Sequence, residues 1–516
     1  MRLALPLILG SVAITVLACT SLPNAIGQTD NLDRTATLPQ QADDSYYQSA
    51  SSAVSARIEQ RGIKPAKNVI LFIGDGMGIS TITAARIYAG QSRGLDGESY
   101  KLTMEQLPYA ALSRTYSHDY QVADSASTAT AMVAGIKTRS RVLGVTQDAA
   151  VGNCPSIEGN RTDTLFDIAE RAGLSTGIVS TARITHATPA AAFAETPHRD
   201  WEADSDLKSQ AAEGCEDIAS QLINWNEGDG FEVAMGGGRR NFLPKSVADL
   251  EDKLKKGDRK DGQDLTAQWA AKSDAHTVIH TQADFDAIDF DTDAKVLGLF
   301  ERSHMNYELD RADGIGDEPS LEEMTRAAIT RLSRDEDGYV LMIEAGRIDH
   351  AHHGVNAARA LGDTDVFDQS VAAALEMTNS DDTLIIVTAD HSHTMTIAGY
   401  PSRGNPILGK VDTGLGEDLK AADGKPYTTL SYANGQTACR MVAGIRDCAR
   451  TDLSNTDTTD KNFKQQSLAL APSETHAGED VAIFATGPGA NLISGTMDQN
   501  EIFHVMGRAS GLVAPE

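Results

Sequence analysis

Residues 339–353 read Tyr-Val-Leu-Met-Ile-Glu-Ala-Gly-Arg-Ile-Asp-His-Ala-His-His, an apolar run that ends in side chains of the types that bind metal ions. Asp349 and His353 lie four residues apart, so on a helix they would share one face. A second apolar run, Thr383-Leu-Ile-Ile-Val387, is followed by Asp-His-Ser-His at residues 390–393. Two such clusters, each directly after an apolar run in the sequence, predict a polynuclear metal site.

Further apolar, β-branched runs recur at Val69–Ile73, Gly177–Val179, Glu232–Met235, Val296–Phe300 and Val481–Phe484. Helical patterns lie between several of them, which indicates a mostly parallel sheet covered by helices on both faces. We therefore expect a three-layer α/β sandwich. Ligands in such sheets bind outside the carboxyl ends of the strands. Asp75, Glu344 and Asp390 each stand just past a predicted strand, so we expect them to converge in one crevice.

Two segments break this alternation. Residues from about 395 to 470 are rich in Gly, Asp, Thr and Pro and read as an insertion, a small subdomain on the core. Residues 240–295 carry a charged mixture of Lys, Asp and Gln and are expected to form a solvated helical excursion. With the insertion included, we expect residues 56–516 to form one domain.

The N-terminus has the pattern of a secretory signal, with Arg2 ahead of a short apolar core. We predict a signal peptide over residues 1–18 and a tether over residues 19–55, a polar stretch without apolar periodicity. Cys19 resembles the lipid-acceptor cysteine of bacterial lipoproteins, although Val16-Leu17 departs from the usual cleavage sequence. The alternative is ordinary cleavage nearby. We expect an exported protein of the periplasm or cell envelope, anchored to a bacterial membrane through Cys19.

The other four cysteines are even in number, and an exported chain meets an oxidising compartment, so two disulfides are expected. Sequence order favours Cys439 with Cys448, which leaves Cys154 with Cys215, although three pairings are formally open. A zinc–cysteine site is the competing interpretation, but none of the four shows Cys-x-x-Cys spacing.

The chain of 516 residues is strongly acidic, with a formal net charge of -28 and a pI near 4.8. This charge argues against nucleic acid as a dedicated partner, because its phosphates require a basic surface. An anionic ligand would have to be attracted locally. Bound divalent cations would reverse the local field and allow an acidic chain to bind phosphate or a carboxylate.

Two further segments carry candidate catalytic side chains. Asp75 lies in Ile73-Gly-Asp-Gly-Met-Gly78, a strand-to-helix turn whose glycines let the backbone approach a ligand. The alternative is an aspartate that caps the helix expected from about Ile79. Ser125 opens a small-residue helix that ends at Gly135, where N–H groups and the helix dipole favour an anion. No histidine neighbours Ser125 in sequence, so a metal is the expected activator of its hydroxyl; the alternative is a simple N-cap serine.

Seven ordered blocks resemble the alkaline phosphatase family over roughly Lys67 to Gly511. They are Asn68–Gly78, Asp124-Ser125 with its Ala/Thr helix, Thr185–Pro189, Arg199–Trp201, Glu344–His353, Thr388–His391 and Glu474–Asp480. Details such as His186, His350 and the segment around Cys215 resemble the animal-type branch. The family implies hydrolysis of phosphate monoesters through a phosphoserine intermediate, with a broad substrate range and an alkaline optimum. It also implies a homodimer, with the insertion at 395–470 forming a crown-like part of it.

The resemblance assigns a role to each matching residue and implies two Zn²⁺ and one Mg²⁺ per chain. Ser125 would be the nucleophile, and Arg199 would clamp the phosphate. The first zinc would be held by Asp349, His353 and His476. The second would be held by Asp75, Asp390, His391 and Ser125. The magnesium would be held by Asp75, Thr188 and Glu344, where Thr188 replaces the serine of many animal-type members.

The chemistry explains these residue types, since two zinc ions roughly 4 Å apart can stabilise both the attacking and the leaving oxygen of an in-line displacement. Nitrogen-containing ligand sets suit zinc, whereas an all-oxygen set suits magnesium. The remaining histidines of the clusters are expected to support the ligands rather than bind metal: His186, His350 and His393. Phe300, Glu301 and Glu318 resemble part of the calcium site of animal-type members, although an ordinary acidic loop is the favoured interpretation of these residues.

Three rival functions are weaker. Sulfatases need a Cys/Ser-x-Pro-x-Arg setting, which the residues after Ser125 do not supply. Phosphodiesterases of the same superfamily usually carry a threonine nucleophile and lack ligands such as Glu344 and Thr188. A surface lipoprotein that only buffers zinc would leave Ser125 and Arg199 without roles.

Overall fold

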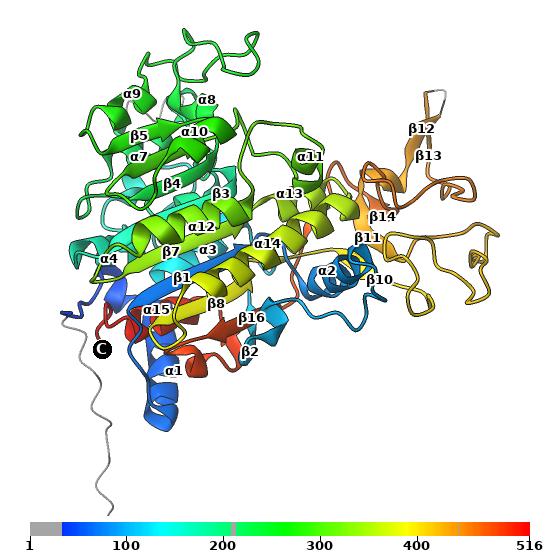
Figure 1. Ribbon diagram of the computed structural model, residues 1–516, viewed down its shortest axis with the longest axis horizontal. Helices are drawn as coiled ribbons and strands as arrows, with labels where there is room; N and C mark the ends of the chain where they lie inside the picture. The colour runs from blue at the N-terminus through cyan, green and yellow to red at the C-terminus, as the bar shows by residue number, and fades with distance from the viewer. Residues whose placement is uncertain (1–33, 208–212, 443, 516) are drawn as a thin grey trace, which may run out of the picture.

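The computed structural model describes residues 34–207, 213–442 and 444–515, and its centre is a ten-stranded sheet (Figure 1). In spatial order the strands are β17 (Gly495–Asp498), β2 (Tyr109–Arg114), β16 (Val481–Thr486), β8 (Thr383–Ala389), β1 (Asn68–Gly74), β7 (Tyr339–Ala345), β3 (Ser175–Arg183), β4 (Val233–Gly237), β6 (Lys295–Leu299) and β5 (His276–Ile279). The strands from β8 to β5 are parallel, whereas β16 runs antiparallel to both of its neighbours.

The alternating side chains of the central strands feed two separate cores. In β1, Val69 and Leu71 join the core on one face, and Ile70 and Phe72 join the core on the other. One core packs against α1 (Ser45–Arg61), α3 (Ser125–Ala134), α4 (Leu165–Arg171), α7 (Ile218–Asn224) and α15 (Glu501–Ala509). The other packs against α2 (Ile79–Ser92), α12 (Leu321–Leu332) and α14 (Ala357–Met377). Burial on both faces is the reason these strands are continuously apolar, and the predicted three-layer sandwich is confirmed.

The shorter helices occupy the connections. They are α5 (Ala187–Ala190), α6 (Asp204–Leu207), α8 (Arg239–Phe242), α9 (Leu265–Ala270), α10 (Gln282–Ala287), α11 (Glu308–Ala312) and α13 (Arg347–His353). All seven apolar runs noted in the sequence form strands. The expectation of a helical excursion over residues 240–295 is wrong in part, because β5 lies there and pairs with β6 at the edge of the sheet. Its sequence, His-Thr-Val-Ile, is short and half-exposed, and so gives little apolar signal.

The packed part of the chain begins earlier than the sequence suggested. Helix α1 starts at Ser45, where the Asp44 carboxylate accepts hydrogen bonds from the first N–H groups of the helix. Tyr47 and Val54 are fully buried, and α1 packs against α15. The tether expected over residues 19–55 is therefore too long, because small and polar residues hid the buried face of the helix. The predicted signal peptide and Cys19 lie outside the described residues.

Residues 395–470 build small sheets of their own, drawn in yellow and orange in Figure 1. One sheet joins β10 (Met395–Ile397), β11 (Leu430–Gly435) and β14 (Ser467–Leu470), and another joins β12 (Arg440–Val442) and β13 (Ile445–Asp447). At the base of the segment, β9 (Ser392–His393) pairs with β15 (His476–Ala477). None of the helices in the described ranges is long and apolar enough to cross a bilayer.

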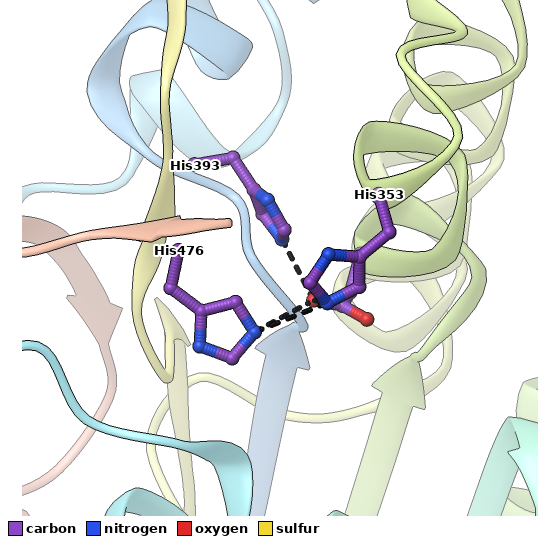
Figure 2. A group of neighbouring side chains, drawn as sticks. His353, His393 and His476 are labelled. Atoms are coloured by element: carbon purple, nitrogen blue, oxygen red, sulfur yellow. Dashed lines mark hydrogen bonds and ion pairs between the residues drawn. The ribbon is translucent and has the colours of Figure 1, made fainter. Parts of the chain in front are cut away.

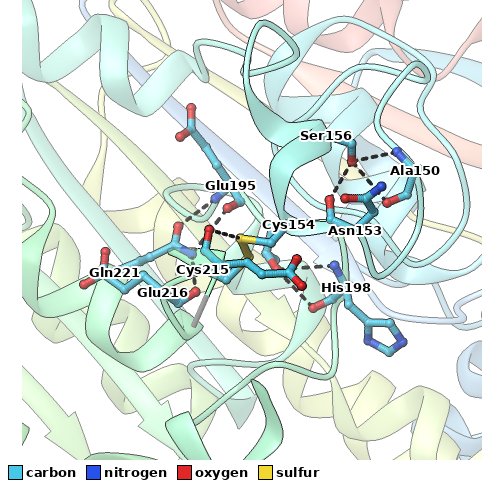
Figure 3. The surroundings of a disulfide bond; sticks show 11 residues. Ala150, Asn153, Cys154, Ser156, Glu195, His198, Cys215, Glu216 and Gln221 are labelled. Atoms are coloured by element: carbon cyan, nitrogen blue, oxygen red, sulfur yellow. Dashed lines mark hydrogen bonds between the residues drawn. A yellow bond between two sulfur atoms is a disulfide. The ribbon is translucent and has the colours of Figure 1, made fainter. Parts of the chain in front are cut away.

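Two disulfides are present, in the pairing that sequence order favoured. Cys439 and Cys448 close the hairpin of β12 and β13, with their Cα atoms 4.0 Å apart. Cys154 and Cys215, whose Cα atoms are 5.6 Å apart, join two segments 61 residues apart in sequence (Figure 3). Cross-links of this kind are typical of proteins that fold in an oxidising compartment.

Candidate metal centre and active site

The carboxyl ends of three adjacent strands bring the predicted acidic residues together. Asp75 follows β1, Glu344 lies near the end of β7, and Asp390 follows β8. All three side chains are fully buried. Because β7, β1 and β8 are neighbours and parallel, residues separated by more than 300 positions meet at one edge of the sheet.

The first cluster centres on the Asp349 carboxylate of helix α13. One of its oxygens lies 3.3 Å from His353 Nε2, 3.3 Å from His476 Nε2 and 2.7 Å from His393 Nε2. Figure 2 shows the three imidazoles pointing to a common centre from three different segments. As expected, the four-residue spacing of Asp349 and His353 places both on one face of a helix.

Hydrogen bonds at the far side of the rings decide which nitrogens can accept a metal. His353 Nδ1 donates to the carbonyl oxygen of Glu474 at 2.6 Å, and His476 Nδ1 donates to that of Ala123 at 2.8 Å. Both Nε2 atoms therefore present lone pairs, 3.3 Å apart, towards the same point. Two facing lone pairs repel each other, so this arrangement fits a cation between them.

His393 differs from those two histidines. Its Nδ1 bonds Glu474 Oε2 at 2.6 Å while its Nε2 bonds Asp349, so both nitrogens already contact carboxylates. Burial alone would lower its pKa, but the hydrogen bond and charge of Asp349, followed by those of Glu474, raise the pKa of His393 to about 9. This geometry is that of a side chain that orients Asp349.

A second cluster surrounds the Ser125 hydroxyl. His391 Nε2 lies 3.2 Å from Ser125 Oγ, 3.2 Å from Asp390 Oδ2 and 3.5 Å from Asp75 Oδ1. The other oxygen of Asp390 accepts hydrogen bonds from the backbone N–H groups of Gly76 and His391, both at 2.9 Å. Asp390 is thereby oriented, and its Oδ2 accepts a long hydrogen bond from Thr128 Oγ1, at 3.5 Å, which leaves that oxygen able to bind a ligand.

A third group contains oxygen atoms without partners. Asp75, Glu344 and His186 each place one ligand atom within 4.8 Å of the others. Both carboxylate oxygens of Asp75, Oε1 of Glu344 and the hydroxyl of Thr188 are buried and make no hydrogen bond with a described residue. Burial and the neighbouring acidic groups raise the pKa of Asp75 well above its ordinary range, and burial raises the pKa of Glu344 to about 7. Unpartnered acidic oxygens at this density fit bound cations.

The serine stands at the start of helix α3 as predicted, but Asp124 is the N-cap. Asp124 Oδ1 accepts from Ser127 N–H, and Asp124 Oδ2 lies 3.1 Å from Arg199 Nη1. Arg199 Nη2 lies 3.2 Å from His186 Nε2, so the guanidinium is held at both ends. These residues line a cavity of about 1040 Å³, which also reaches His353 and His476.

Two residues near the site had no role in the sequence-based prediction. Glu474 is buried and holds His393, and its proximity to His476 in sequence was the available signal. The His304 ring lies 3.9 Å from the ring of His350 and 5.3 Å from that of His186. A histidine in the loop after β6 gives no sequence signal of that packing.

The residues considered for calcium also lie together. Asn306 donates to Glu301 Oε1 at 2.8 Å through its side chain and to Glu318 Oε1 at 2.7 Å through its backbone. Burial, then the charges of Glu318 and Glu251, raise the pKa of Glu301 to about 8. Glu251 was missed in the sequence, because it comes from a distant acidic loop. Arg239 lies 3.1 Å from Glu251 and 2.9 Å from the carbonyl oxygen of Phe300.

Comparison with known proteins agrees with this geometry. Residues 66–512 match the family model described as alkaline phosphatase. The chain is 41% identical over 478 residues to the tissue-nonspecific alkaline phosphatase of Mus musculus, covering 91% of this chain and 88% of that protein. It is 41% identical over 452 residues to the Homo sapiens isozyme, covering 86% and 84%.

Solved structures show the same fold. The alkaline phosphatase of Thermus thermophilus superposes with a TM-score of 0.63 at 28% identity, over 87% of this chain and 92% of that one. The enzyme of the Antarctic bacterium TAB5 superposes with a TM-score of 0.58 at 23% identity, over 87% and 99%, and supports the fold alone. This chain belongs to the alkaline phosphatase family. It is a hydrolase of phosphate monoesters, and its family is typically metal-dependent.

Proposed function

We propose that the three clusters hold two zinc ions and one magnesium ion per chain, with the ligands predicted from the sequence. The observation that carries this proposal is the set of buried ligand atoms that make no hydrogen bond with any described residue, above all both oxygens of Asp75. Asp75 belongs to two of the candidate metal groups, which supports a bridging role between the second zinc and the magnesium. His186 is within reach of the magnesium group, but its contact with Arg199 supports the role of orienting that guanidinium.

The chain's own residues then bind and orient the phosphoryl group. The planar fork of Arg199 binds two phosphoryl oxygens, and its contacts with Asp124 and His186 orient it before substrate arrives. Ser125 Oγ lies at the start of α3, where backbone N–H groups favour the negative charge of the phosphoryl oxygens.

The reaction is a double displacement. Ser125 loses its hydroxyl proton to solvent, and its Oγ attacks phosphorus as the bond to the leaving-group oxygen breaks. This forms phosphoserine, and the leaving oxygen takes a proton from solvent and departs as the alcohol. Water arriving from the open side of the cavity, next to His353 and His476, then hydrolyses phosphoserine and releases inorganic phosphate. When bound, the two zinc ions would supply the positive charge that stabilises the attacking and leaving oxygens in both steps.

Ser125→Ala tests this mechanism directly. We expect loss of nearly all hydrolysis of p-nitrophenyl phosphate at alkaline pH, loss of the phosphoserine intermediate, and unchanged zinc content by elemental analysis. Ser370→Ala is a matched control, because Ser370 is a buried helical serine that bonds only the carbonyl of Val366. Full activity in Ser125→Ala would overturn the nucleophile assignment. A zinc-to-magnesium ratio other than two to one would overturn the assigned ions.

We also propose a calcium ion held by Glu301, Glu318 and Glu251, with the carbonyl of Phe300. The support is the grouping of three acidic side chains, in which burial and then the charges of Glu318 and Glu251 raise the pKa of Glu301 to about 8. The measurement is the melting temperature with and without added Ca²⁺, in the wild type and in Glu318→Gln. An equal response in both proteins would sink this assignment.

The quaternary structure is proposed to be a homodimer formed through residues 395–470. Three large apolar side chains on this segment are almost fully exposed, namely Tyr400 at 94%, Leu415 at 89% and Leu468 at 85%. Exposed apolar side chains gathered on one segment are typical of an interaction surface. Light scattering measures the mass, and a monomer in both wild type and the Tyr400→Ser, Leu468→Ser double variant would contradict the proposal.

Export remains a proposal that rests on the N-terminal sequence and the two disulfides. We propose cleavage before Cys19 and a lipid anchor on that residue in the periplasm or cell envelope. Mass spectrometry of the mature N-terminus tests it. An unmodified N-terminus downstream of Cys19 would leave only ordinary cleavage.

A further inference from the structure

Arg141 has a backbone conformation that an arginine rarely adopts. Its φ is +74°, and among the described residues the other non-glycine residue with a positive φ is Val355. Glycine occupies this left-handed region freely, whereas a residue with a Cβ is strained there. Such outliers cluster at binding and catalytic sites, so the position calls for a functional explanation.

The backbone of Arg141 is fixed between the two groups that flank the phosphate position. Its N–H donates to Asp124 Oδ2 at 3.1 Å, and its carbonyl oxygen accepts from the N–H of Arg199 at 2.7 Å. Asp124 caps the helix that begins with Ser125. The conformation is therefore held by the same contacts that place the nucleophile and the phosphate clamp.

The side chain of Arg141 is exposed, and the residue lines the cavity that contains Ser125 and Arg199. Both backbone polar groups are hydrogen-bonded, so the guanidinium is the polar group of Arg141 that has no bonded partner among the described residues. No carboxylate among the described residues lies in ion-pair distance of it, whereas Arg199 is paired with Asp124. On a chain of net charge -28, an unpaired cation at this place is unusual.

The two acidic side chains of the outer cavity, Asp119 and Asp200, form no ion pair with Arg141 in the described part of the chain. Asp119 accepts hydrogen bonds from Ser140 N–H at 2.9 Å and Ser117 Oγ at 3.1 Å. Asp200 is exposed, and its carboxylate lies 3.9 Å from His198 Nδ1. The guanidinium of Arg141 thus remains available to a ligand in the cavity.

We propose that Arg141 is a specificity residue that binds a second anionic group, carboxylate or phosphate, on the leaving group of the substrate. This inference rests on the proposed placement of the phosphoryl group between Ser125 and Arg199. A monoester bound there directs its leaving group into the open cavity, along whose wall Arg141 lies. A guanidinium matches the planar, bidentate geometry of either anion.

The test compares substrates that differ only in the second charge. The first pair is 3-phosphoglycerate and glycerol 3-phosphate, for a carboxylate. The second is propane-1,3-diol bisphosphate and its monophosphate, for a phosphate. The measured quantity is the ratio of kcat/KM for the doubly charged over the singly charged member, at low and high salt.

Arg141→Gly and Arg141→Asn both tolerate a positive φ, so they remove the charge without disturbing the fold. We expect the ratio to fall about fivefold in each, chiefly through KM, as for one exposed ion pair. Arg141→Lys keeps the charge and should retain most of the ratio. High salt should lower the wild-type ratio and leave that of Arg141→Asn nearly constant. Lys101→Gln, the same charge change at an exposed position outside the cavity, should not alter the ratio.

A ratio equal in wild type, Arg141→Gly and Arg141→Asn would overturn the proposal. So would an equal fall in Arg141→Lys, because the backbone rather than the charge would then be responsible. These outcomes are distinct from failure of the proposed function. If Ser125→Ala abolishes activity while the Arg141 variants keep the ratio, the inference about Arg141 alone is wrong.

Discussion

The two ends of the central sheet both bury carboxylates, but they neutralise them differently. At the amino end, Lys295 Nζ lies 2.9 Å from Glu232 Oε1 and donates to the carbonyl oxygen of Gly230 at 2.6 Å. Glu170 lies beside them and accepts from Thr176 Oγ1 at 2.5 Å. This end carries its own ammonium ion and its own donors.

The carboxyl end of the sheet holds more carboxylate side chains and fewer cationic side chains. Asp75, Glu344, Asp349 and Asp390 crowd together, and within the described chain no lysine forms an ion pair with any of them. Arg199 is a permanent cation whose charge acts on Asp75, and it is paired with Asp124. Because the chain supplies a cationic side chain for the buried carboxylates at the amino end, it could do the same at the carboxyl end. The shortage of cationic side chains at the carboxyl end therefore indicates a place suited to bound cations.

Removing the metal ions should have the largest effect, because it leaves the clustered carboxylates of the catalytic end without most of the positive charge that balances them. We expect a chelator to lower kcat/KM for p-nitrophenyl phosphate about a thousandfold, as loss of several kcal/mol of charge stabilisation requires. The melting temperature should fall as well, and zinc with magnesium should restore both. Activity that persists in protein shown by elemental analysis to be metal-free would break the comparison.

Removing the cation of the amino end should act on stability alone. Lys295→Met leaves Glu232 buried without its partner, so we expect the free energy of unfolding to fall by about 3–5 kcal/mol. The kcat of the folded enzyme should stay unchanged. Lys272→Met is the control, since Lys272 is exposed and its ammonium group lies over the ring of Trp269. A midpoint of urea unfolding equal to that of the wild type would contradict the proposed role of Lys295.

The pH dependence of the amino end gives the last prediction, which leaves the fold intact and changes only the charge of one carboxyl group. Burial, then the charge of Glu232, raises the pKa of Glu170 to about 8. A raised folded pKa means that this contribution to stability is complete below the ordinary value of 4.5 and is lost as pH rises through 8. The stability advantage of wild type over Glu170→Gln should therefore shrink by roughly 4 kcal/mol between pH 5 and pH 9. A constant difference in unfolding free energy would show that Glu170 does not titrate in that range.

The sequence predicts the central sheet well because its strands are buried on both faces. Strands β2 and β17 are not predicted from the sequence because they lie at the far edge of the sheet. There β2 exposes Tyr109 and Leu112, and a strand that is not buried on both faces need not be a continuous run of apolar residues. Helix α1 was missed for a related reason, since its buried face is built largely from Ala and Ser.

The residues of the site also divide into those that a local sequence pattern reveals and those that it does not. Ligand types next to strand ends, such as Asp349 and Asp390, can be recognised by spacing. Residues that act through distant packing, such as His304 beside His350, carry no local pattern. Arg141 could not be found either, because a positive φ at an arginine is a property of the folded backbone.

The pairing of β9 with β15 has a consequence for how this enzyme can vary. His393 and His476 face each other in that short ladder, so the long excursion between them starts and finishes at the same point. Loop-closure entropy rises only slowly with length, by about 0.6 kcal/mol for each doubling. The pairing of β9 with β15 therefore allows the segment between them to be lengthened, shortened or replaced while His393 and His476 keep their positions.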